Sequence, residues 1–320
     1  MKAEPGRDGV EAWKVNFSGR PLFLPDGIEK KGEALLERWA ECFPEEKTFI
    51  QLALGIPSLV VCVDCAWRNG LLLPYEINDR PYGIGTLFTH SPCFRERFSA
   101  VRKTWPPVSV VFTDGARRGD DGAWAENIMR VEDAKAKKPE AVLVRAAFWE
   151  DRLVEEFSSV SVFPVKTSGS KLYGVEMGLW RRVEKEEELP WDSGFALKPF
   201  CGSGTDCVLV RVPRSEPEYR GAGFTKSHIL RVFGEILERD GGMYLQPFIP
   251  PMACPEPDKG MYMMYKLYWG FDVAEEEYVF LGGCWNTRKG KQVKIHGASD
   301  ACFGNLIPAD YPAQCFQFGY

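Results

Sequence analysis

The residues with the clearest chemical potential are Asp64, Glu76 and Asn78, which lie in the segment VVCVDCAWRNGLLLPYEIND. An Asn-Gly pair separates two runs of strand character, which is a strong signal for a two-residue hairpin turn. Glu76 and Asn78 stand two residues apart, so their side chains project from the same face of the second strand. Pairing across the turn can bring Asp64 close to both.

Two carboxylates and one amide carbonyl on a single sheet surface are hard oxygen donors, which suit Mg2+. This ion usually takes one or two carboxylates and fills its remaining positions with substrate phosphate and water. Solvent-facing polar residues on an ordinary antiparallel hairpin are the alternative. Just beyond the hairpin, Arg80 is either a structural partner of the acidic pair or an anion ligand. Gly83 and Gly85 suit a tight turn or a close approach of the backbone to a ligand.

A second informative stretch, FALKPFCGSGTDCVLV, combines a strand that carries Lys198 with a loop of Gly202, Ser203 and Gly204. Small residues in such a loop allow backbone N–H groups to close around phosphate oxygens, and a nearby lysine supplies positive charge. The same residues also fit a plain hairpin turn between two strands.

The elements that must position these residues follow from the pattern of apolar residues. Helical spacing predicts a packing helix over GEALLERWAECF, and from residue 108 predicted strands alternate with helices. The strands are VSVVFTDG, AVLVRAAF and VSVFPV, and the helices are AWAENIMRVEDAKAK and EDRLVEEFSS. This alternation is typical of a parallel α/β layer. No GxGxxG follows these strands, which disfavours a dinucleotide site.

The C-terminal half is predicted to contain two helices and a series of strands. One helix covers SKLYGVEMGLWRRVEKEEEL and the other KSHILRVFGEILERDGG, which ends at a glycine pair. Strands are predicted at MYLQPFIPP, MYMMYKLYWGFD and EYVFLGGCWNTR.

The order of these segments resembles the ATP-grasp fold. It runs from a lysine on a strand through a glycine loop, a helix, the QPFIP strand and a strand with a basic residue to GGCWNTR. The metal-binding strand normally follows that block, whereas VDCAWRNGLLLPYEIND precedes it here. The sequence is therefore similar to the circularly permuted ATP-grasp families, including the glutathionylspermidine synthase-like group, with EINDRPYGIG as the most specific part. The implied fold class is mixed α+β and α/β, with a small Rossmann-like pre-ATP-grasp subdomain.

The resemblance implies a role for each group of candidate residues. By this resemblance, Lys171 and Lys198 contact the nucleotide phosphates, the loop of Gly202, Ser203 and Gly204 closes over them, and Gln246, Phe248 and Ile249 lie on the hinge strand that holds adenine. Lys266 and Arg288 lie near the transferred phosphate, Arg80 is a further catalytic candidate, and Asp64, Glu76 and Asn78 bind Mg2+ as a pair of ions. Gln246 stands where the family commonly has an acidic residue. His296, Asp300 and Asn305 match the family's terminal Asn- and Gly-containing segment only loosely.

The implied activity is that of an ATP- and Mg2+-dependent ligase. It would activate a small-molecule or peptide carboxylate as an acyl phosphate and join it to an amine or a thiol. A small-molecule kinase and a non-catalytic nucleotide-binding regulatory protein are the alternatives. The expected domains are a helical packing segment (1–48), the permuted metal hairpin (49–100), the pre-ATP-grasp-like layer (101–165) and the nucleotide-binding subdomains with the tail (166–320).

Composition narrows the class of protein further. A formal net charge of -5 gives no bulk cationic character, so neither nucleic acid nor an anionic membrane is an expected partner. No apolar run approaches the roughly 20 residues that span a bilayer, and the N-terminal residues lack the apolar core of a secretory signal. A cytoplasmic protein is expected, with its ten cysteines reduced and mostly buried. The CxxC of Cys62 and Cys65 has no second CxxC to complete a zinc site.

Overall fold

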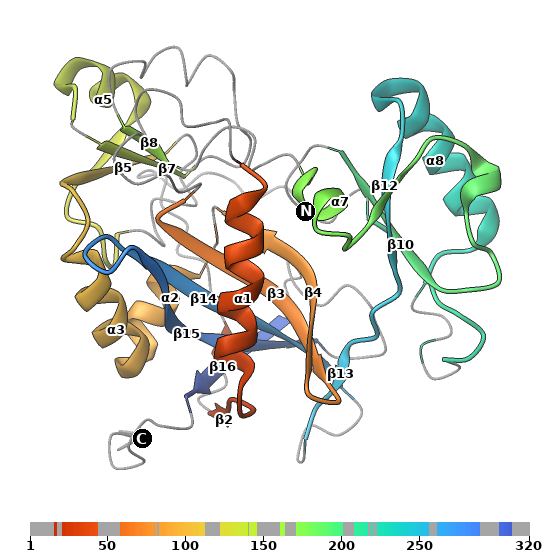
Figure 1. The fold of residues 1–320 in the computed structure, drawn as a ribbon, viewed down its shortest axis with the longest axis horizontal. Coiled ribbons are helices and arrows are strands. Elements are labelled where there is room, and N and C mark those ends of the chain that lie inside the picture. Colours follow the sequence, from red (N-terminus) through yellow and green to blue (C-terminus); the bar gives the residue numbers. More distant parts are fainter. Residues whose placement is uncertain are drawn as a thin grey trace.

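In the computed structural model, the described residues form three sheets with helices packed against them (Figure 1). The structure describes residues 16–17, 21–43, 58–79, 81, 83–112, 122–139, 141–145, 161–163, 171–200, 208–216, 219, 223–255, 261–288 and 301–308. Parallel and antiparallel sheets both occur, so the fold is mixed α/β. Among the described residues, no helix has both the length and the apolar character needed to cross a membrane.

The largest sheet has eight strands and carries most of the candidate residues. Its main path runs in the order β1-β16-β15-β14-β3-β4, and off this path β13 pairs with β14 and β2 pairs with β16. The strands are β1 (Asn16–Phe17), β2 (Leu22–Phe23), β3 (Val60–Arg68), β4 (Leu71–Asn78), β13 (Met252–Ala253), β14 (Tyr262–Asp272), β15 (Glu277–Arg288) and β16 (Ala301–Ile307). The early hairpin β3–β4 thus pairs with β14, which lies about 200 residues later in the chain.

Helices cover both faces of this sheet, which accounts for its long buried strands. The predicted N-terminal helix is confirmed as α1 (Ile28–Glu41), and its Trp39 packs in one apolar cluster with Trp269 of β14. A Cβ on Gly32 would overlap the Trp269 ring, so this close approach requires glycine. On the opposite face, α2 (Ile84–His90) and α3 (Pro92–Arg102) pack their apolar side chains against Tyr268 and other strand residues.

The predicted hairpin is confirmed, and it also contains a bulge. Asn69 and Gly70 both have positive φ, as a tight turn of this kind requires. Asp64 pairs with Glu76, but the next residue, Cys65, pairs with Pro74, so Tyr75 is left as the extra residue. Proline has no N–H to donate to the ladder and is tolerated at bulges and on edge strands, and β4 is an edge strand.

An antiparallel four-stranded sheet forms the second unit, in the order β11-β10-β12-β9. Its strands are β9 (Arg181–Val183), β10 (Phe195–Pro199), β11 (Leu209–Arg211) and β12 (Met243–Pro247). One predicted helix is confirmed as α8 (Lys226–Asp240), and its Ile229, Phe233 and Ile236 pack in one apolar cluster with the sheet. Its C-terminal end follows the predicted glycine signal, since Gly241 has positive φ. At its N-terminal end, the Thr225 hydroxyl accepts from the His228 N–H.

One predicted helix in this unit is wrong. The segment 170–189 forms only a short helix, α7 (Tyr173–Glu176), followed by strand β9 and a 3-10 turn at Glu186–Glu188. Gly178 has positive φ and ends the helix, and the Trp180 ring packs directly on Gly174. The strand then forms because it pairs with β12, which outweighs the local preference for helix.

The third unit is a parallel sheet in the order β6-β5-β7-β8, as the alternating pattern predicted. Its elements are β5 (Val108–Phe112), β6 (Ile128–Arg130), α5 (Val131–Lys137), β7 (Ala141–Arg145) and β8 (Ser161–Phe163). The helix predicted over 123–137 is wrong in its first half, because residues 128–130 pair with β5 as a strand. The helix predicted over EDRLVEEFSS lies outside the described residues.

Candidate functional site

Two carboxylates and a lysine occupy one row across the large sheet. Asp64 on β3 lies opposite Glu76 on β4 on one side and opposite Lys266 on β14 on the other. Residues directly opposite each other on antiparallel strands point to the same face, so the three side chains share one surface. The hairpin therefore brings the predicted metal ligands next to a predicted phosphate-contacting residue.

Asp64 and Lys266 form a buried ion pair. The Lys266 Nζ lies 2.8 Å from Oδ1 of Asp64 and 3.1 Å from Oδ2, and the Asp64 side chain is only 1% exposed. Burial alone would lower the pKa of Lys266, but the Asp64 carboxylate and the nearby Cys62 thiol outweigh burial and raise it. The site therefore favours the charged ammonium form of Lys266.

Glu76 pairs with a second lysine, which arrives from a distant part of the chain. The Lys171 Nζ lies 3.3 Å from Oε1 of Glu76, and the side chain of Lys171 is 6% exposed against 25% for Glu76. Lys171 immediately precedes α7, where the Trp180 indole N–H donates to the Lys171 carbonyl at 2.8 Å. The main chain at Lys171 is thus fixed by the ring that packs on Gly174.

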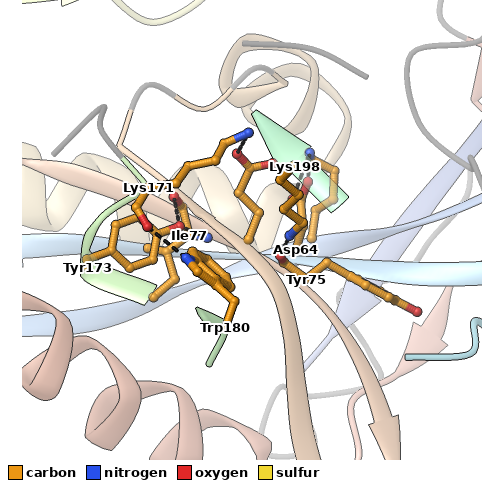
Figure 2. A network of polar contacts seen from close by, with 9 residues as sticks. Asp64, Tyr75, Ile77, Lys171, Tyr173, Trp180 and Lys198 are labelled. Atoms are coloured by element: carbon orange, nitrogen blue, oxygen red, sulfur yellow. Dashed lines mark hydrogen bonds and ion pairs between the residues drawn. The ribbon is translucent and has the colours of Figure 1, made fainter. Parts of the chain in front are cut away.

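Tyr173 attaches this segment to the free edge of β4. Its hydroxyl accepts from the Ile77 N–H at 2.9 Å and donates to the Ile77 carbonyl at 3.0 Å. Burial raises the pKa of Tyr173 well above its usual value, so the hydroxyl remains protonated and able to donate. Figure 2 shows Lys171, Tyr173 and Trp180 gathered around Ile77, which lies between Glu76 and Asn78. Tyr173 therefore holds the strand that carries two of the predicted metal ligands.

We expect Tyr173→Phe to lower the free energy of unfolding by about 1–3 kcal/mol, because it leaves the buried Ile77 N–H without its acceptor. Urea unfolding measures this loss. Tyr75→Phe is the matched control, since the buried Tyr75 hydroxyl has no hydrogen-bond partner among the described residues and its removal should cost nothing. Equal stability of the two variants would contradict the attachment role of Tyr173.

The bulge at Tyr75 provides acceptors for side chains of the second sheet. Lys198 of β10 donates to the Tyr75 carbonyl, and the Gln246 side chain of β12 donates to the Pro74 carbonyl at 2.8 Å. The Lys198 Nζ also lies 4.8 Å from the centre of the Trp180 ring. Burial lowers the pKa of Lys198 to about 8, with Glu76 opposing and Lys171 adding to the shift. Figure 2 shows Lys198 reaching toward Tyr75.

Five charged side chains thus meet at the junction of the two sheets. We call them the lysine–carboxylate cluster: Asp64, Glu76, Lys171, Lys198 and Lys266.

Asn78 lies two residues beyond Glu76 on β4, opposite Cys62, and is half-buried. The two carboxylates and the amide provide oxygen donors that fit Mg2+ chemically. Asp64 becomes available to a metal only if Lys266 moves, and no group of three or more His, Cys, Asp or Glu side chains suited to a metal occurs among the described residues.

Of the predicted hinge residues, Gln246 lies within β12, and Phe248 and Ile249 come after the strand. The Phe248 N–H donates to the Gly194 carbonyl at 3.0 Å, and the Phe248 ring packs against Tyr219. Ile249 packs against the apolar cluster beneath α1. Gln246 is 3% exposed and its side chain is engaged by Pro74, so only its main chain can contribute to a ligand site.

Other candidates lie farther from the cluster or cannot be placed. Arg288 ends β15 opposite Tyr262, and Asn305 on β16 donates to the His90 carbonyl at 2.9 Å. Asn305 lies two strands from Lys266 along the same row, with Cys284 between them. Arg80, Gly202, Ser203, Gly204, His296 and Asp300 lie outside the described residues.

The cysteine pair of the hairpin does not form a site. Cys62 and Cys65 lie three positions apart on β3, so they point to opposite faces of the sheet and belong to different apolar clusters. Each of the described cysteines is a free thiol. Burial raises the pKa of both Cys62 and Cys65, which disfavours the thiolate forms that metals and electrophiles require.

No known protein-family model matches the sequence, and no curated protein matches it. Among solved structures, the chain is similar to a putative gamma-glutamylcysteine synthetase from Methylobacillus flagellatus KT, at 11% identity and a TM-score of 0.45, over 89% of this chain and 87% of that one. It is also similar to a glutathione synthetase-like effector from Globodera pallida, at 10% identity and a TM-score of 0.46, over 92% and 90% of the two chains. A D-alanine–D-alanine ligase from Helicobacter pylori aligns over 44% of this chain and 46% of its own, at 12% identity and a TM-score of 0.24. Similarities of this size assign neither a family nor an activity.

Proposed function

We propose that this chain is an ATP- and Mg2+-dependent ligase of the circularly permuted ATP-grasp type, which activates a carboxylate and joins it to an amine or a thiol. The observation that supports this most is the lysine–carboxylate cluster. It unites the hairpin β3–β4, the segment 171–198 and strand β14 at one place, in the combination that the sequence resemblance requires.

Each part of the cluster has a distinct role in the proposal. Lys171 and Lys198 bind the nucleotide phosphates, together with the loop 202–204, and the main chain at 246–249 holds the adenine. Lys266 lies near the transferred phosphate, and Arg288 and Arg80 are further candidates for that role. Asp64, Glu76 and Asn78 would hold Mg2+, which neutralises phosphate charge when bound.

The proposed reaction needs no protein nucleophile. A substrate carboxylate oxygen attacks the terminal phosphorus of ATP, the bond to the bridging oxygen breaks, and ADP leaves. The acyl phosphate then reacts with an amine or thiol, which displaces inorganic phosphate and loses a proton. Lysine ammonium groups held in a largely buried site stabilise the charge that develops on the phosphoryl group, because they need no reorientation at the moment of transfer.

The lowered pKa of Lys198 predicts a pH-dependent affinity for nucleotide. The ammonium is charged below a pH of about 8 and neutral above it, and only the charged form attracts phosphate. We therefore expect affinity to fall as pH rises through this value, by up to about tenfold per pH unit, with uptake of a proton on binding. Calorimetry in two buffers of different ionisation enthalpy measures both effects. Lys198→Arg should abolish the pH dependence, and an affinity that is constant with pH in the wild type would contradict the role of Lys198.

The activity itself is tested by ADP release from ATP and Mg2+ in the presence of carboxylic acids, with hydroxylamine as the amine. An acyl phosphate reacts with hydroxylamine to give a hydroxamate, so a ligase should produce ADP and hydroxamate in equal amounts. Release of ADP that depends on an alcohol, without any acid, would instead identify a kinase and overturn the ligase proposal.

A further inference from the structure

We propose that Lys171 and Lys266 occupy the metal-binding carboxylates in the ligand-free protein, so that Mg2+ enters only together with the nucleotide whose phosphates take over the two ammonium groups. This inference rests on the proposed function and concerns the order in which ligands reach that site. In the ligand-free protein the two lysines are counter-ions of the carboxylates, and in the nucleotide-bound protein they contact the phosphates.

Both carboxylates already have a cationic partner. Lys266 contacts both oxygens of Asp64, at 2.8 and 3.1 Å, and Lys171 lies 3.3 Å from Glu76. The two lysine side chains are 11% and 6% exposed, so solvent screens these pairs only weakly. Because Asp64 and Glu76 lie opposite each other across β3 and β4, one incoming cation would disturb both pairs.

A divalent cation that enters alone must displace at least one ammonium group. That group would remain largely buried without a counter-charge. If it is Lys171, it would also face the positive charge of Lys198, which is hydrogen-bonded to the neighbouring Tyr75 carbonyl. An uncompensated buried charge is strongly destabilising. The lysines that neutralise the carboxylates therefore disfavour the binding of Mg2+ in the absence of nucleotide.

Binding of a nucleoside triphosphate changes this balance of charges in the cluster. Its anionic oxygens accept strong, charge-assisted hydrogen bonds from lysine, so each displaced ammonium group gains a new partner as the metal gains the carboxylates. Mg2+ also keeps phosphate oxygens among its ligands, so metal and nucleotide bind more favourably together than either one alone. The exchange leaves every charge of the cluster paired.

Calorimetric titration of Mg2+ into the full chain tests this order, with and without the β,γ-imido analogue of ATP. We expect no detectable binding of Mg2+ alone to the wild type at millimolar concentrations, and clear binding with the analogue present. Lys171→Met removes the ammonium group from Glu76 and should allow Mg2+ alone to bind at least about tenfold more tightly than to the wild type, a difference of about 1.4 kcal/mol. Lys171 is chosen because its partner is partly exposed, at 25%, so the variant should fold.

Two control variants separate this exchange from a general effect of charge. Lys171→Arg retains the cation and should exclude Mg2+ as the wild type does. Lys137→Met removes one exposed positive charge on α5 and should leave Mg2+ binding unchanged. Mg2+ that binds the wild type equally well with and without the analogue, or a Lys171→Met variant with unchanged affinity for Mg2+ alone, would overturn the inference. If the analogue does not bind at all, the result counts against the ligase proposal. The inference is still tested in that case, because the wild type and the Lys171→Met variant are compared with Mg2+ alone.

Discussion

Glu76→Gln should reduce Mg2+- and ATP-dependent turnover by about 10²–10³-fold, the cost of losing one preorganised electrostatic group at a reacting phosphate. The amide retains the shape of the side chain but cannot carry the negative charge that a divalent cation requires. The fold should survive, since the Glu76 side chain is partly exposed and lies on an edge strand. Steady-state ADP release measures the activity, and circular dichroism checks the fold.

A matched control for Glu76→Gln is Glu235→Gln on α8. Glu235 also forms an ion pair with a basic residue, Arg231, but both side chains are exposed and lie on the second unit's helix. This variant makes the same chemical change and should retain full activity. If Glu76→Gln were as active as Glu235→Gln, the hairpin would have no part in the reaction.

Lys266→Met should lower the free energy of unfolding by about 3–5 kcal/mol, because it leaves the Asp64 carboxylate buried without its counter-charge. The double replacement of Asp64 by Leu and Lys266 by Met should recover most of this loss, since no charge then remains to be compensated. Chemical denaturation of the single and double variants measures the coupling between the two residues.

Arg231→Met provides the comparison for an exposed ion pair, and its cost should not exceed about 1 kcal/mol. A Lys266→Met variant that is as stable as Arg231→Met would show that Asp64 is stabilised by groups other than Lys266. Full stability of the Lys266→Met variant would likewise contradict a buried charge at Asp64.

The parts of the fold that the sequence predicts are those with local signals. The Asn69-Gly70 turn and the glycine end of α8 at Gly241 each depend on residues within a few positions, and both have the expected conformation. The hydrophobic runs of β14 and β15 also give long strands where they are predicted. In such segments, local preference and tertiary packing agree.

The secondary-structure predictions are wrong where pairing with another strand determines the local conformation. Residues 181–183 become a strand because β12 lies beside them, and residues 128–130 because β5 does. Strand β16, which is not among the strands predicted from the sequence, completes the large sheet beside β15. In each case the partner strand lies outside the few neighbouring residues that a local pattern covers, so that pattern cannot reveal the pairing.

The site itself is partly visible in the sequence. Asp64, Glu76, Lys171, Lys198 and Lys266 are predicted candidates that the structure brings together. The supporting contacts are not predictable from spacing. Tyr173 and Trp180 resemble ordinary core aromatics, and the bulge at Tyr75 becomes meaningful only when Lys198 and Gln246 arrive at its carbonyl groups. Pro74 on the second strand is the one local sign of a bulge there.

Thermal unfolding with the β,γ-imido analogue of ATP and Mg2+ tests most directly whether nucleotide binds at the lysine–carboxylate cluster. A ligand that binds only the native state stabilises it by mass action, by about 2.7 kcal/mol at a concentration one hundred times the Kd. We expect a clear rise in Tm for the wild type and a much smaller one for Lys198→Ala, each compared with the same protein without ligand. No rise for the wild type at millimolar nucleotide, or an equal rise for Lys198→Ala, would contradict a nucleotide site at this cluster.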